Sequence, residues 1–405
     1  MWYTQPFIRT RYIKTLHSHS IILLPRTSKE PYRMEGLPLD IISNLPSSII
    51  QTILTFMPIR DAFRTSVLSR NWRYHCANIT KLDFNDEMRR RSGKYKLSLD
   101  IYKVLLLHHG PVLEFSLCMF ELDSCFEIDK IILYLSRNTA LEKLTLCIGL
   151  DGHYHKLPSS FFSFQNLTHL KLFNCAIHPL ASFSGFGRLT SLCFYDVVIT
   201  KSTLLWFLRC CPKIKNFTLI GDELCFIESG CSDFIDLFQC LPLIEHLEMN
   251  SYLIKFFALG AIPQKFTNAI VHLNFLCLSK LSFKNEDVLC AVLLLVSRSP
   301  NIEKIKLEMC RYNTKEMVSQ TKDFFDLLGY SCISLEHLRE LEITRFLGMK
   351  PEMNFVKVIL SKSPMLEKVR LVFGEQINFT DRLETQEGLL EFPRASSRAK
   401  VTFGR

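Results

Sequence analysis

The sequence predicts an α/β protein built mainly from one long array of repeated helix and strand units. A short pattern of apolar residues recurs along most of the chain, proline-containing turns precede several copies, and a helical apolar stripe comes before the array. Of the 405 residues, 48% are hydrophobic and 22% are charged. We therefore expect a large packed core over most of the length.

Residues 1–35 are expected to be a basic, disordered extension. Residues 1–33 carry six basic side chains and one acidic side chain, a net charge of +5 out of +9 for the whole chain. Their arginine content and shortage of acids are typical of an organelle transit peptide. We favour the alternative that translation starts at Met34 and that residues 1–33 extend the gene model, because a compact motif begins shortly after Met34.

Residues 36–80 are predicted to form three short helices. Pro46 fits the first turn of the first helix and Pro58 ends that segment. Residues 61–67 and 69–74 are predicted to form the other two helices. Such small helices cannot bury their apolar residues alone, so the stripe on the first helix needs a partner surface. The stripe consists of Leu45, Ile49, Ile50, Ile53, Leu54 and Met57.

This segment resembles an F-box, in the form found in plant F-box proteins. The resemblance rests on the order of Leu45-Pro46, Met57-Pro58, the string 64–69 (RTSVLS) and Trp72-Arg73. The alternative is that the helices simply cap the array. The resemblance implies docking on a Skp-family linker protein, which connects to a cullin–RING ubiquitin ligase. The residues that would form or support this docking face, some of them as internal core, are Leu45, Pro46, Ile49, Ile53, Leu54, Pro58, Val67, Leu68 and Trp72.

Residues 81–333 are predicted to be leucine-rich repeats. The pattern apolar-x-x-apolar-x-apolar occurs eleven times between Ile79 and Leu371, with successive copies 22 to 36 residues apart. A proline stands just before several copies, for example Pro300 and Pro364, where it ends a helix and leads into a strand. The array is therefore an irregular solenoid of helix, turn and short strand.

The concave face of this solenoid is predicted to bind a protein substrate. Within each strand, the apolar positions of the pattern face the core and the intervening residues face the concave side. The charges in this column are mixed, which suits a protein better than a polyanion. The residues predicted to bind the substrate are Lys143, His169, Lys171, Phe173, Tyr195, His246, Glu248, Lys304 and Lys306. The column also holds Thr145, Ser191, Asn250, Glu340, Glu342, Lys368 and Arg370, and the alternative for each residue is an ordinary solvated strand position.

Residues 334–405 are predicted to close the array, because a repeat array needs a terminal cap over its last open core. We expect a helix over 354–361, a strand over 366–373, a polar loop over 376–388 and a final half-buried strand over 399–403. The strings 366–371 (LEKVRL) and 389–396 (LLEFPRAS) resemble the FBD module of plant F-box proteins with leucine-rich repeats.

Taken together, the resemblance covers residues 36–405 and implies the plant F-box/FBD/LRR-repeat family. It implies a substrate-recognition adaptor subunit of a Skp–cullin–F-box ubiquitin ligase, located in the nucleus or the cytoplasm. Two alternatives stay open. One is a hormone co-receptor of the same ligase class, and the other is a leucine-rich-repeat scaffold that acts without a ligase.

We expect no enzyme activity, cofactor or metal site. The sequence lacks hydrolase, zinc-protease, phosphate-loop and dinucleotide motifs, and its 15 cysteines form no C-x-x-C pair. His153 and His155 lack a convincing third metal ligand. Outside residues 1–33 the net charge is only +4, and the chain has no run of about 20 apolar residues. Neither a nucleic acid nor a membrane is therefore expected as a partner.

Overall fold

The computed structural model describes most of the chain from residue 41 to residue 404. The described ranges are 41–42, 44–84, 94–120, 126–149, 154–178, 183–222, 226–227, 234–258, 269–310 and 334–404. The chain divides into two units, Met1–Asn44 and Leu45–Arg405, and the fold described below is that of the second unit. The predicted extension over 1–35 and the candidate ligand His153 lie outside the described residues.

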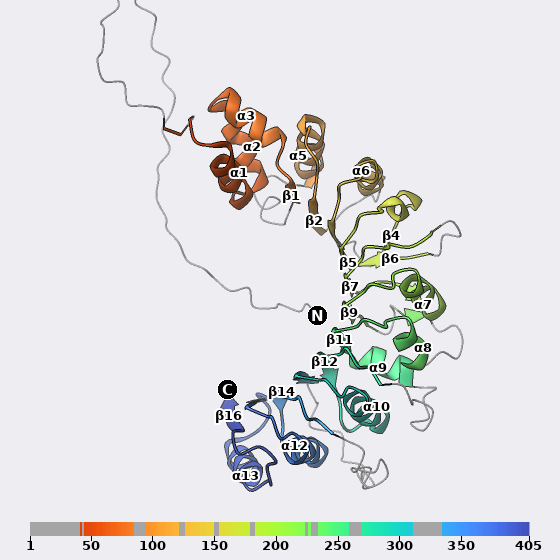
Figure 1. The fold of residues 1–405 in the computed structure, drawn as a ribbon, viewed down its shortest axis with the longest axis vertical. Coiled ribbons are helices and arrows are strands. Elements are labelled where there is room, and N and C mark those ends of the chain that lie inside the picture. Colours follow the sequence, from red (N-terminus) through yellow and green to blue (C-terminus); the bar gives the residue numbers. More distant parts are fainter. Residues whose placement is uncertain are drawn as a thin grey trace, which may run out of the picture. The chain divides into compact units, whose positions relative to one another are not determined.

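A parallel sheet of twelve strands runs through the described part of Leu45–Arg405 (Figure 1). Its first eleven strands coincide with the eleven copies of the apolar pattern, so the predicted solenoid is confirmed. The strands, in their order across the sheet, are β1 (Lys81–Phe84), β2 (Glu114–Phe120), β3 (Lys143–Gly149), β5 (His169–Phe173), β7 (Ser191–Tyr195), β9 (Asn216–Ile220), β11 (His246–Asn250), β12 (Phe275–Leu281), β13 (Lys304–Met309), β14 (Glu340–Phe346), β15 (Lys368–Phe373) and β16 (Lys400–Gly404).

Helices connect the strands and lie along one side of the sheet (Figure 1). We call the opposite side of the sheet the open face. The helices are α5 (Lys94–Leu107), α6 (Phe126–Ser136), η2 (Ser159–Ser163), α7 (Lys201–Arg209), α8 (Phe234–Gln239), α9 (Ser251–Ala258), α10 (Glu286–Ser297), α12 (Lys350–Lys362) and α13 (Phe379–Leu390). Two small parallel pairs, β4 (His155–Lys156) with β6 (Cys175–Ala176) and β8 (Ile199–Thr200) with β10 (Phe226–Ile227), lie beside this framework.

The core lies between the helices and the sheet. In the repeat around β3, for example, Leu141, Leu144 and Leu146 are all buried, as the pattern predicts. The predicted turns are also present, since α10 ends just before Pro300 and α12 just before Pro364. Burying such side chains contributes about 1.5–3 kcal/mol each, so stacked repeats stabilise one another.

Among the described residues, three α-helices and one 3-10 turn precede the sheet, namely α1 (Ser47–Phe56), α2 (Ile59–Arg64), η1 (Thr65–Val67) and α3 (Arg70–Ala77). Pro46 and Pro58 precede α1 and α2, where their missing N–H groups cost no helical hydrogen bond. The Ser69 hydroxyl accepts a hydrogen bond from the Trp72 backbone N–H at 3.2 Å and caps α3. Their shared core includes Ile50, Leu54, Ile59, Ala62, Trp72 and Cys76.

The C-terminal segment corrects one prediction. The polar loop expected over 376–388 is largely the helix α13. The Asn378 side-chain oxygen accepts a hydrogen bond from the Asp381 N–H at 2.7 Å and begins this helix. Leu389 is the buried residue of α13, so the helix lacks the inward apolar stripe that reveals a helix in sequence. The expected last strand is confirmed as β16, parallel to β15.

In the described part of the chain, no helix has the length and apolar character that crossing a membrane requires. The same residues contain no group of three side chains able to ligate a metal ion.

Candidate functional site

The helices α1–α3 keep large apolar side chains in solvent. Phe56 is 85% exposed and Val67 is 80% exposed, and the remaining members are about half exposed or more. Exposed apolar groups of this size on a small helical module are typical of a protein contact surface. We call these residues the N-terminal apolar set: Ile49, Phe56, Val67, Leu68 and Tyr74.

The structure sorts the residues predicted to dock the linker. Ile49, Val67 and Leu68 are exposed, as are the two prolines Pro46 and Pro58, whereas Leu45 and Ile53 are half-buried. Leu54 and Trp72 are 2% and 3% exposed. These last two residues are internal core and can only support a docking face from below.

Phe56 and Tyr74 were missed in the sequence. Phe56 follows Ile49 by seven positions and Ile53 by three, so it continues the same helical stripe and the spacing could have revealed it. Tyr74 is exposed on α3, where the polar neighbours give no comparable signal.

On the open face, the predicted substrate residues fall into rows that run across the strands. The first row contains Lys81, Glu114, Lys143, His169, Ser191, Asn216, His246, Phe275, Lys304, Glu340, Lys368 and Lys400. The second row contains Asp83, Ser116, Thr145, Lys171, Cys193, Thr218, Glu248, Cys277, Lys306, Glu342, Arg370 and Thr402.

Charges in these rows pair with their neighbours across strands. The Glu114 carboxylate lies 2.6 Å from the Lys143 ammonium and 4.0 Å from that of Lys81. Toward the other end, Glu340 binds Lys304 and Lys368, and Glu342 binds Lys306 and Arg370. Three predicted substrate contacts, Lys143, Lys304 and Lys306, are therefore already ion-paired within the sheet.

The middle of the open face is largely uncharged and carries aromatic side chains. The rings of Phe173 and Tyr195 stack with centroids 4.5 Å apart and planes 4° from parallel. The rings of His246 and Phe275 lie 5.4 Å apart. On β11, Glu248 accepts a hydrogen bond from the Thr218 hydroxyl at 3.2 Å. Four of the predicted substrate residues, Phe173, Tyr195, His246 and Glu248, thus lie in this middle part of the open face, which with Phe275 we call the aromatic centre.

The Cys277 thiol in the same region is protonated. Burial, together with the nearby Glu248 carboxylate, raises the pKa of Cys277 to about 11. Burial likewise raises the pKa of Tyr195. Because a thiolate and not a thiol is the nucleophile, Cys277 is a packing group at neutral pH.

Asn250 was predicted to lie on the open face of the sheet, and this prediction is wrong. It is fully buried, and its side-chain amide donates a hydrogen bond to the Gly221 carbonyl at 2.6 Å. Its oxygen accepts a hydrogen bond from the Leu253 N–H at 3.4 Å, at the start of α9. The chain turns from β11 into α9 directly, so the strand alternation breaks at this residue.

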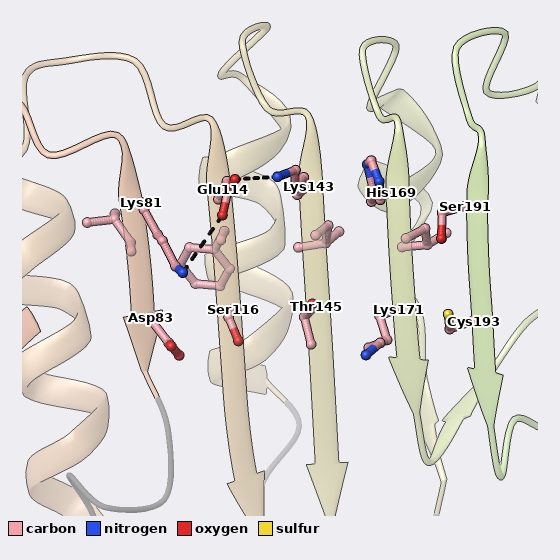
Figure 2. A pocket seen from close by; sticks show the side chains of 14 residues that line it. Lys81, Asp83, Glu114, Ser116, Lys143, Thr145, His169, Lys171, Ser191 and Cys193 are labelled. Atoms are coloured by element: carbon pink, nitrogen blue, oxygen red, sulfur yellow. Dashed lines mark hydrogen bonds and ion pairs between the residues drawn. The ribbon is translucent and has the colours of Figure 1, made fainter. Parts of the chain in front are cut away.

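A shallow depression of about 410 Å³ lies on the open face over β1, β2, β3, β5 and β7 (Figure 2). The ion-paired group of Lys81, Glu114 and Lys143 forms one side of it, and Lys171 and His169 come from β5. Partial burial, and then the Lys143 charge, lower the pKa of His169, which favours a neutral imidazole. The lining also includes Asp83 and the small hydroxyl and thiol side chains of Ser116, Thr145, Ser191 and Cys193. The depression offers hydrogen-bonding groups to a peptide laid across the strands.

Comparison with known families agrees with this architecture. The F-box domain family matches residues 42–83, which contain α1–α3 and most of β1. The family described as "FBD-associated F-box protein At5g56370, LRR repeats" matches residues 131–235, from α6 to α8. The chain thus resembles F-box proteins over its first helices and the leucine-rich repeats of FBD-associated F-box proteins over part of the sheet.

Relatives extend the likeness along the chain. The F-box/FBD/LRR-repeat protein At1g13570 of Arabidopsis thaliana is 28% identical over 90% of this chain and 98% of its own length. The FBD-associated F-box protein At5g56370 of the same plant is 32% identical over 46% of this chain and 44% of its own length. The predicted resemblance to the plant F-box/FBD/LRR-repeat proteins is therefore confirmed.

Among solved structures, the leucine-rich repeat-containing protein LegL7 from Legionella pneumophila is similar over 77% of this chain and 90% of its own length. Its sequence identity is 13% and the TM-score is 0.33. At this TM-score and identity, the likeness says nothing about the function of this chain.

Proposed function

We propose that this chain is the substrate-recognition adaptor subunit of a Skp–cullin–F-box ubiquitin ligase. It binds a Skp-family linker protein through α1–α3 and holds a target protein on the open face of the sheet for ubiquitination. Catalysis belongs to other subunits, and the adaptor acts by raising the local concentration of the target near the ubiquitin-conjugating enzyme. The proposal includes action in the nucleus or the cytoplasm.

The exposed N-terminal apolar set carries this proposal. A Phe56 side chain with 85% of its surface in water gains about 1.5–3 kcal/mol when a partner buries it. The F-box match over residues 42–83 supports a Skp-family linker as the partner, and the buried Leu54 and Trp72 pack beneath the exposed set.

Co-purification with a plant Skp-family linker tests the first half of the proposal. Phe56→Asp and Val67→Asp should each weaken linker binding more than tenfold, because each puts a charge into the proposed contact. Leu106→Asp is the matched control, since Leu106 is 75% exposed on α5 but lies outside α1–α3. Linker binding that is absent in the wild type, or equal in all four proteins, would favour a scaffold that acts without a ligase.

The second half places the target protein on the aromatic centre of the open face. A photo-crosslinking amino acid at Tyr195, in cells with a blocked proteasome, should capture a protein that becomes ubiquitinated. The same amino acid at Leu133, exposed on the helical side of the sheet, is the control. Capture of ubiquitinated protein only from Leu133 would contradict the assignment of the open face.

A further inference from the structure

The helix α13 turns three large apolar side chains into solvent. Phe379 is 76% exposed, Leu383 is 42% exposed and Leu390 is 56% exposed. They follow one another at steps of four and seven positions, so they form one stripe along the helix. We call this stripe the α13 ridge.

The ridge faces away from the side of α13 that packs on the protein. On that packed side, Leu389 is buried, and a Cβ on Gly388 would lie 3.5 Å from the end of the Met353 side chain on α12. The neighbouring helix α12 buries most of its apolar residues, including Phe355 and Ile359. The outward apolar stripe of α13 therefore has no counterpart on the neighbouring helix α12.

Acidic side chains flank the ridge on one side. Glu384, Glu387 and Glu391 follow at steps of three and four, so they form a line parallel to the ridge, and all three are exposed. Within the described part of the chain, none of the three takes part in an ion pair. The cation of this helix, Arg382, is turned inward, since its guanidinium donates to the Gly404 carbonyl and lies 4.8 Å from the Phe373 ring centroid.

We propose that the α13 ridge is a docking site for a basic amphipathic helix of a partner protein. Such a helix would place apolar residues spaced by three or four positions on Phe379, Leu383 and Leu390, and lysines or arginines on Glu384, Glu387 and Glu391. This site is independent of the proposed linker and target surfaces, which lie on α1–α3 and on the open face.

The negative charges of Glu384, Glu387 and Glu391 favour a basic helix over two other possible occupants of the ridge, a second copy of this chain and a lipid surface. A second copy of the chain would present the same acidic line, and an anionic lipid surface would be repelled by it. A cationic partner turns those carboxylates into ion pairs. The acidic line also stands out on a chain whose net charge is +9.

Two synthetic peptides test the proposal with the full-length chain bound to its Skp-family linker. One is an 18-residue helix with leucines at helical spacing and lysines elsewhere, and the other has glutamates in place of the lysines. Fluorescence anisotropy should show binding of the basic peptide, weakening as salt rises, and at least tenfold weaker binding of the acidic one.

Variants locate the binding. Phe379→Ser with Leu383→Ser, and separately Glu384→Lys with Glu387→Lys, should each weaken binding of the basic peptide at least tenfold. The controls are Leu133→Ser, an exposed leucine on α6, and Glu303→Lys with Glu336→Lys, two exposed acids outside α13. These controls should bind as the wild type does.

Three results would overturn the proposal: no binding of the basic peptide, binding that both α13 variants retain, or equal binding of the acidic peptide. Sedimentation velocity provides a further check. Self-association of the wild type that the Phe379→Ser, Leu383→Ser variant abolishes would assign the ridge to a second copy and contradict a basic partner.

Discussion

Glu352 shows how a single side chain can link stability to pH. It is almost fully buried, and its carboxylate accepts hydrogen bonds from the N–H groups of Leu347 at 2.9 Å and Gly348 at 3.0 Å. Burial outweighs these donors and raises the pKa of Glu352 to about 7, from an ordinary value of 4.5. The folded chain therefore holds a proton that the unfolded chain releases between these two values.

The sign of the effect follows from that difference. Stability from protonated Glu352 is fully present below about pH 4.5 and is lost as pH rises through about 7. We expect the wild type to lose roughly 2–3 kcal/mol relative to Glu352→Gln between pH 5 and pH 8. Thermal unfolding of both proteins across this range measures the difference, and parallel curves would contradict the raised pKa.

Asn250 is a second residue whose role the structure defines. Asn250→Ala removes a helix cap from α9 and leaves the buried Gly221 carbonyl without its donor. We expect a loss of about 2 kcal/mol in the free energy of unfolding. Urea denaturation should show this loss for Asn250→Ala and little change for Asn216→Ala, a half-exposed position on the neighbouring strand.

At the scale of elements, the strands β13, β14 and β15 are joined by ion pairs as well as by backbone hydrogen bonds. Glu340 lies between Lys304 and Lys368, and the hydrogen bonds from these lysines lower the pKa of Glu340. Its carboxylate therefore favours folding above the ordinary carboxyl pKa, and this contribution fades in acid.

Charge reversal at this position should be sensitive to salt. Glu340→Lys places three lysines side by side across the strands, so it should lower the melting temperature in dilute buffer. Most of the loss should disappear in 0.5 M salt, because these side chains are partly in water and a Debye length there is only about 4 Å. A loss that high salt leaves unchanged would indicate damage to packing instead.

The strands of the main sheet could be predicted from the sequence, whereas one helix, α13, could not. Strands β1–β15 of the main sheet were predictable because their core residues repeat at fixed positions, as Leu144 and Leu146 show. The helix α13 was missed because its large apolar residues face water and its buried contact is mainly Leu389. The spacing of apolar residues shows that they share one face of a helix, but it does not show whether that face packs on the protein or faces water.

For the candidate surfaces, the motifs predicted which residues take part, but not how exposed each side chain is or which side chains lie beside it. The F-box motif pointed to Ile49, Val67 and Leu68, whereas Phe56 stands out by its exposure in the structure. On the open face, Lys304 and Lys306 looked available until the strand register placed Glu340 and Glu342 beside them. Such pairings join residues about 36 positions apart, and no local pattern encodes them.

At the scale of the whole molecule, the last strands close the array. Removing residues 375–405 would strip α13 and β16 from β15 and expose its Val369, Leu371 and Phe373. We expect the shortened chain to aggregate on size-exclusion chromatography and to unfold at a lower urea concentration, since an uncovered repeat end is unstable.

A control separates capping from docking. The variant Phe379→Ser with Leu383→Ser alters only exposed side chains of α13, so its urea midpoint should match that of the wild type. A midpoint as low as that of the shortened chain would mean that the α13 ridge is itself part of the folded core.

The alternating charges across the open face also restrict how this gene can change length. Loss of the unit that contains β14 would bring Lys304 opposite Lys368 and Lys306 opposite Arg370, and loss of the β2 unit would bring Lys81 opposite Lys143. A recombination event that removed either of these two units would therefore produce a chain with facing like charges, which destabilise a sheet. The electrostatics of these strands thus disfavour deletion of the β14 unit or the β2 unit.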